Sequence, residues 1–137
     1  MSGAFDRADL EQRLGQVFAG YPDIEAVYLF GSLATGRIHP GSDLDLAIVP
    51  CHPRVLERRL DILTDLARAG YCEVDLVFIT GADLVLDYEA VRLNELVYAR
   101  EGFDRGELYS KVVRRYLDFL PYLEVQRKAY RRRILNG

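Results

Sequence analysis

One motif constrains this chain more than any other feature. A Gly-Ser pair at residues 31–32 is followed, after ten residues, by Asp-Leu-Asp at 43–45, and apolar segments flank both ends. A strand that ends in a small-residue turn lets backbone N–H groups approach a phosphate. Two carboxylates spaced by two residues lie on one face of a strand. The motif therefore predicts a nucleoside-triphosphate site that uses metal ions.

A third aspartate strengthens this prediction. Asp75 interrupts the apolar segment 73–79, where an unpaired buried carboxylate would be costly. If this strand neighbours the one carrying Asp43 and Asp45, three carboxylates converge, and repulsion raises their pKa values unless a cation lies between them. Magnesium suits such ligands, and two ions about 3.5–4 Å apart can serve phosphoryl or nucleotidyl transfer. Either half of the motif alone would be weak evidence, because Asp-x-Asp near a turn is common.

Hydrophobic periodicity predicts a single α/β domain of 137 residues, with strands interleaved between helices. Residues 96–99 fit either an edge strand or a continuation of the preceding helix. Pro121 lies inside the last helical segment and should kink or break it. We expect a short helical turn from Ser32, strands over 25–30, 43–49 and 73–79, and helices over 8–18, 54–69, 83–95 and 104–133.

Charge is distributed unevenly along the chain. The net charge of −3 gives no general signal for nucleic acid, but residues 111–133 hold eight Lys and Arg against two acidic residues, leaving −9 for the remainder. This asymmetry indicates either a basic contact surface or a solvated helix face.

Other sequence features indicate the cellular compartment and the kind of metal site to expect. Cys51 and Cys72 imply no disulfide framework and fit a reduced cytoplasm, and neither a signal core nor a membrane-spanning segment is evident. His52 beside Cys51 lacks partners at zinc spacing, so we expect no zinc.

These residues resemble the nucleotidyltransferase superfamily with a DNA-polymerase-beta-like core. Its Gly-Ser-x10-Asp-x-Asp motif is complete, and Asp75 matches its third strand carboxylate. The resemblance covers residues 25–80 and implies an α+β core with a mixed sheet flanked by helices. It also implies two Mg²⁺ ions held by Asp43, Asp45 and Asp75, with the triphosphate of ATP near the Gly-Ser turn. Many relatives carry an arginine where this chain has Thr35, and Arg37 is the candidate replacement.

The short length and the segment 97–101 before a terminal helix are similar to minimal nucleotidyltransferases encoded beside HEPN ribonuclease toxins. That subfamily implies an antitoxin that transfers AMP from ATP to a tyrosine of its toxin and forms a hetero-oligomer with it, with no direct nucleic-acid binding. Two alternatives stay open: a small-molecule nucleotidyltransferase of the aminoglycoside-modifying type, and a non-catalytic binding antitoxin. The chain is not itself the ribonuclease, because neither histidine follows an arginine at the toxin's spacing.

Several candidate site residues have more than one possible role. Gly31 permits close backbone approach to phosphate, or simply a tight turn. Ser32 bonds a phosphate oxygen or caps a helix. Ser42 bonds a phosphate, orients the acidic pair, or stabilises a local turn. Asp75 is either the third metal ligand or the base that accepts the acceptor hydroxyl's proton.

Overall fold

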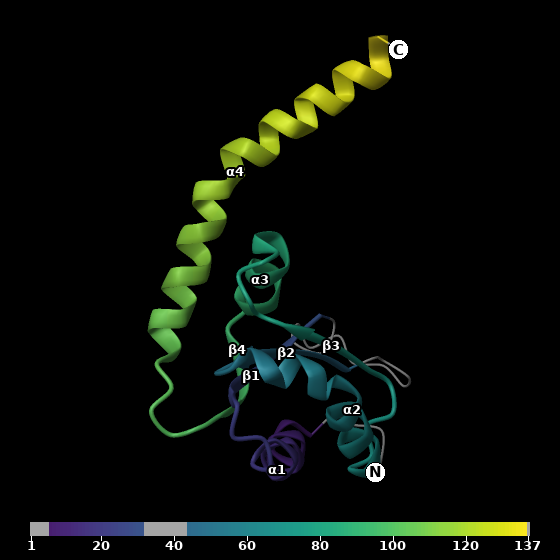
Figure 1. The fold of residues 1–137 in the computed structure, drawn as a ribbon, viewed down its shortest axis with the longest axis vertical. Coiled ribbons are helices and arrows are strands. Elements are labelled where there is room, and N and C mark those ends of the chain that lie inside the picture. Colours follow the sequence, from purple (N-terminus) through teal and green to yellow (C-terminus); the bar gives the residue numbers. More distant parts are fainter. Residues whose placement is uncertain (1–5, 32–43, 137) are drawn as a thin grey trace.

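The computed structural model describes residues 6–31 and 44–136 of the chain. Its centre is a mixed four-stranded sheet in the order β3-β2-β1-β4 (Figure 1). The strands are β1 (Ile24–Phe30), β2 (Leu44–Pro50), β3 (Val74–Phe78) and β4 (Glu95–Ala99). β1 pairs antiparallel with β2 and with β4, whereas β2 and β3 are parallel. The predicted α/β class, the mixed sheet and the three predicted strands are confirmed.

Helices cover both faces of this sheet. On one face, α1 (Arg7–Phe18), the 3₁₀ helix η1 (Pro53–Arg58) and α2 (Arg59–Arg68) enclose the larger core. On the other face, α3 (Leu84–Val91) and α4 (Arg105–Asn136) enclose a smaller core. Successive side chains of a strand point to opposite faces, so each strand contributes to both cores. On β2, Leu46 and Ile48 belong to the first core, whereas Ala47 and Val49 belong to the second. Among the described residues, no helix is long and apolar enough to cross a membrane.

Two predicted helices have different boundaries in the structure. The expected helix over 54–69 begins as a 3₁₀ turn, with Pro53 in the first turn and the His52 side chain accepting the N–H of Arg54. The expected helix over 83–95 ends at Val91, because Asn94 takes a left-handed conformation at φ 55°. Residues 95–99 consequently form the edge strand, which resolves the ambiguity of segment 96–99.

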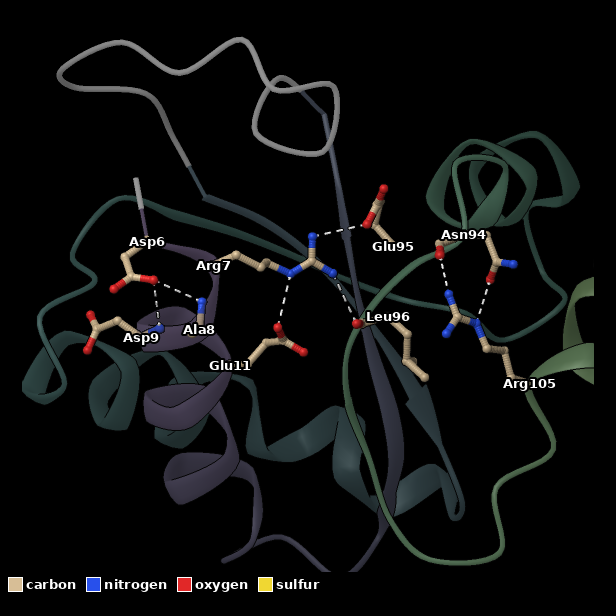
Figure 2. A network of polar contacts seen from close by, with 9 residues as sticks. All are labelled: Asp6, Arg7, Ala8, Asp9, Glu11, Asn94, Glu95, Leu96 and Arg105. Carbon is tan, nitrogen blue, oxygen red and sulfur yellow. Dashed lines mark hydrogen bonds and ion pairs between the residues drawn. The ribbon is translucent and has the colours of Figure 1, made fainter. Parts of the chain in front are cut away.

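The N-terminal helix is tied to the edge strand by a polar network (Figure 2). Asp6 accepts the N–H groups of Ala8 and Asp9 and thereby caps α1. Arg7 donates to the Glu95 carboxylate at 3.0 Å and to the Leu96 carbonyl at 3.2 Å. These contacts hold α1 beside the first residues of β4.

The C-terminal helix is longer than expected and continuous. The sequence predicted a kink or a break at Pro121. α4 runs through Pro121 without a break and changes direction near its middle, which agrees with a kink (Figure 1). Its first half packs on α3, where the Tyr116 and Tyr88 rings stack at 3.9 Å between centroids. Its second half projects away from the body of the molecule (Figure 1).

Candidate active site

Three of the predicted site residues meet at one end of the sheet. Gly31 directly follows β1, and Asp45 and Asp75 are the second residues of β2 and β3. The strand register pairs Phe30 with Asp45, and Asp45 with Asp75. Neighbouring strands lie about 4.8 Å apart, so the two aspartates are direct cross-strand neighbours. The prediction that their strands neighbour each other is confirmed.

Both carboxylates lie on the face of the sheet that α3 and α4 cover. Leu44 and Leu46, on either side of Asp45, belong to the core on the opposite face. Leu76, next to Asp75, belongs to that same opposite core. Since strand side chains alternate, Asp45 and Asp75 project together toward the other side. Asp45 is half-buried and Asp75 is exposed, which gives the pair a solvent-facing side.

Gly31 is fitted against the carboxylate of Asp45. Its φ of +75° is left-handed, a conformation that side chains other than glycine rarely adopt. A Cβ atom built on Gly31 would overlap Oδ2 of Asp45 and lie 2.9 Å from its Cγ. The glycine therefore gives the carboxylate room to lie against the end of β1. Its predicted contact with phosphate stays a prediction.

The remaining predicted site residues lie outside the described part of the chain. They are Ser32, Arg37, Ser42 and Asp43, and their assigned roles stay predictions. Within residues 6–31 and 44–136, the structure contains no group of three side chains able to hold a metal ion. The two described aspartates nevertheless offer oxygen donors on one face, which is the donor chemistry that Mg²⁺ prefers. They therefore fit two of the three expected ligands.

A cavity of about 520 Å³ lies at the opposite end of the same strands. It is lined by the last residues of β2, by Ile79 after β3, and by side chains of α3 and α4. Asp45 and Val49 are four residues apart on β2, or about 13 Å. This cavity is therefore separate from the aspartates.

Asp87 on α3 is a buried carboxylate beside this cavity that the sequence analysis did not single out. It is 4% exposed, its Oδ2 accepts the Gly81 N–H at 2.9 Å, and its Oδ1 has no hydrogen-bond partner among the described residues. Desolvation raises its pKa and Asp83 adds to this, whereas the Gly81 hydrogen bond and Arg115 lower it. The available signal was an acid inside the apolar segment Leu84–Val91.

Asp87 should make the folded state less stable as the pH rises. Its folded pKa lies above its ordinary value, so the folded state binds more protons between those two values, and stability falls across that interval. Asp87→Asn should therefore melt at a higher temperature than the wild type at pH 7.5, with the difference shrinking toward pH 4. Thermal unfolding at both pH values checks this, with the exposed Asp118→Asn as control. A variant that is less stable at both pH values would contradict it.

Comparison with known proteins identifies relatives of this arrangement. A family model described as "Polymerase beta, Nucleotidyltransferase" matches residues 12–102, which include all four strands and Gly31, Asp45 and Asp75. Protein adenylyltransferase MntA of Shewanella oneidensis strain MR-1 is 29% identical over 109 residues, which cover 79% of this chain and 74% of the relative.

Two solved structures have a similar fold. A toxin–antitoxin structure with AMP-PNP superposes with a TM-score of 0.70 at 24% identity, covering 91% of this chain and 98% of the other. A tri-AMPylated Shewanella oneidensis HEPN toxin in complex with MNT antitoxin gives a TM-score of 0.67 at 21% identity, covering 95% and 99%. At these identities the likeness establishes the fold alone.

Proposed function

Because the chain belongs to the Polymerase beta nucleotidyltransferase family, we propose that it is a protein adenylyltransferase antitoxin that transfers AMP from ATP to a tyrosine of a cognate HEPN ribonuclease toxin. One observation carries the catalytic part of this proposal: Asp45 and Asp75 are paired in register on one face, with Gly31 fitted against the Asp45 carboxylate. A chain that only bound a partner would need neither the aspartate pair nor this close fit. The arrangement thus favours an enzyme over a non-catalytic antitoxin.

The identity of the nucleotide and of the acceptor is supported by the relatives. The relative at 29% identity is named a protein adenylyltransferase. One structure of similar fold was determined with AMP-PNP, an ATP analogue, and another contains a tri-AMPylated HEPN toxin bound to its antitoxin. These names support ATP as the donor, a toxin protein as the acceptor, and a hetero-oligomer of the two.

Magnesium is the cation that we propose for this site. Asp45 and Asp75 are placed to hold it together with Asp43, and two ions are expected. When bound, Mg²⁺ would neutralise phosphate charge and favour ionisation of the attacking hydroxyl. The aspartates of the chain would hold the positive charge of the ion at the end of the sheet, where the half-buried Asp45 lies against the end of β1.

The proposed reaction is a displacement at phosphorus. The tyrosine oxygen attacks the α-phosphorus of ATP, a new O–P bond forms, the bond to the β-phosphate oxygen breaks, and pyrophosphate leaves. The phenol proton goes to Asp75 or to solvent, and the exposure of Asp75 allows either route. Ser32, Arg37 and Ser42 are proposed to contact the phosphates.

We place this reaction in the cytoplasm. Both cysteines are free and exposed in the structure, which suits a reducing compartment. ATP and a ribonuclease substrate are available there as well.

Intact mass spectrometry of the toxin tests the proposed function. After incubation with this chain, ATP and magnesium, the toxin should gain mass in units of one AMP, and peptide mapping should locate the gain on tyrosine. The Asp43→Asn/Asp45→Asn variant should produce no gain. An unmodified toxin, with the wild-type chain shown to bind ATP, would contradict the proposal and favour a small-molecule acceptor.

A further inference from the structure

The C-terminal half of α4 exposes several large apolar side chains. Most of the strongly exposed large hydrophobic residues in the described part of the chain belong to α4. Tyr130 is 63% exposed and Ile134 is 61% exposed, although isoleucine is usually buried and tyrosine usually at least partly so. These side chains are concentrated on the projecting segment, which indicates an interaction site. They are Leu117, Tyr122, Val125, Tyr130, Ile134 and Leu135.

Part of this surface continues the stripe that packs inside the molecule. Tyr109, Tyr116, Leu123 and Tyr130 recur every seven residues, so they lie along one side of α4. The first two belong to the packed half, where Tyr116 stacks on Tyr88 of α3. The short helix α3 ends at Val91 and covers only that half (Figure 1). The half-buried Leu123 and the exposed Tyr130 and Ile134 continue this side of the helix beyond α3, and they are here called the distal stripe.

Charge indicates what covers the distal stripe. Residues 122–135 hold Arg127, Lys128 and three consecutive arginines at 131–133, against Glu124 alone. Two such helices packed side by side would bring like charges together, which disfavours pairing between two copies of this segment. A helix whose apolar stripe has acidic flanks would complement both the shape and the charge. A packed helix is also what the same stripe already contacts at α3.

We propose that the distal stripe is the surface by which this chain holds its toxin, packing against a toxin helix with acidic flanks. The inference rests on the proposed function, because it takes the toxin as the partner. It separates binding from chemistry: residues 12–102 match the family and carry the aspartates, whereas the distal stripe lies outside that match. Loss of the stripe should weaken toxin binding without altering the transfer step.

A pair of matched double variants tests this assignment. Leu123→Glu/Tyr130→Glu places two charges on the distal stripe. The opposite-face variant Tyr122→Glu/Val125→Glu introduces the same two charges away from the stripe, again replacing one tyrosine and one aliphatic residue. At about 100° per residue, Val125 lies opposite the stripe and Tyr122 lies about 100° from Leu123. Both variants change the net charge equally. Both sets of sites lie outside the two cores, so the fold should survive in each.

The distal-stripe variant should bind the toxin at least about 30-fold more weakly in titration calorimetry, because apolar anchors of this kind dominate interfaces. Its KM for the toxin should rise by a similar factor, with kcat at saturating toxin and affinity for ATP unchanged. The opposite-face variant should resemble the wild type. If both variants weakened toxin binding equally, only the net charge would matter, and the assignment of the distal stripe as the toxin-binding surface would be wrong.

The outcomes separate this inference from the proposed function. If the wild type modifies the toxin and the distal-stripe variant binds it normally, the inference is wrong and the function stands. If the wild type does not modify the toxin at all, the proposed function fails. If the wild type alone is a dimer in light scattering and the distal-stripe variant is a monomer, the stripe serves a second copy, which overturns the assignment to the toxin.

Discussion

Replacing Asp45 by asparagine is expected to lower the rate of AMP transfer by at least about 10³-fold, or about 4 kcal/mol of transition-state stabilisation. The substitution keeps the shape of the side chain but removes the charge that would hold a cation beside the triphosphate. It also relieves repulsion with the neighbouring Asp75, so the fold should be retained. Single-turnover kinetics with toxin and ATP, together with circular dichroism, check both statements.

Asp61→Asn is the matched control. Asp61 is an exposed aspartate on α2, on the other face of the sheet, where it pairs with Arg58 at 2.7 Å. The same chemical change there should leave the transfer rate within about twofold, because a surface ion pair contributes little. If the Asp45 variant were as active as this control, the assignment of Asp45 to the catalytic site would be wrong.

Asp75 was singled out by its position within an apolar strand, and the strand register explains why it lies beside Asp45. A carboxylate that follows strand alternation must lie on a defined face, and β2 and β3 are joined by a crossover through η1 and α2 that makes them parallel neighbours. Alternation along each strand therefore determines the face of Asp45 and Asp75, whereas their common level comes from the register of β2 and β3. Which of them binds metal and which accepts a proton depends on distances that spacing does not determine.

Other features depend on contacts between distant parts of the chain, and sequence patterns did not reveal them. The early end of α3 depends on the left-handed Asn94, whose side chain and carbonyl both accept from Arg105 (Figure 2). The place of β1 between β2 and β4 follows from pairing across about seventy residues. Burial of Asp87 arises from the packing of α3 and α4 over the sheet. None of these three features is determined by the local sequence alone.

In the terminal helix, local propensity determines that the segment is helical, whereas tertiary packing determines which part of it is covered. Pro121 removes one backbone donor, and a proline ring crowds the carbonyl four residues earlier, so a bend is expected there. The helix nevertheless continues on both sides of it and changes direction near its middle (Figure 1). The sequence predicted a helix over the whole of 104–133 but could not indicate that α3 covers only its first half. A truncation after Arg105 would therefore remove Val112 from the core on the α3 face. The matched distal variants avoid that loss.

Gly31→Ala is expected to reduce AMP transfer by about 100-fold, because an added methyl group would occupy the space of the Asp45 carboxylate and displace it. The substitution also carries a conformational cost of about 1–2 kcal/mol for a left-handed alanine. The effect on activity must therefore be distinguished from simple destabilisation. Urea unfolding and single-turnover kinetics on the same preparations make that distinction.

Gly102→Ala supplies the control for that distinction. Gly102 has a similar left-handed conformation, with φ +90°, but an added Cβ would meet nothing within 4 Å. Both variants should thus carry the same backbone cost in the free energy of unfolding, to which Gly31→Ala adds the overlap with Asp45, and only Gly31→Ala should lose activity. If the two variants lost activity equally, the loss would follow from backbone strain alone. Gly31 would then act only as a turn residue, and the close fit between β1 and Asp45 would have no part in catalysis.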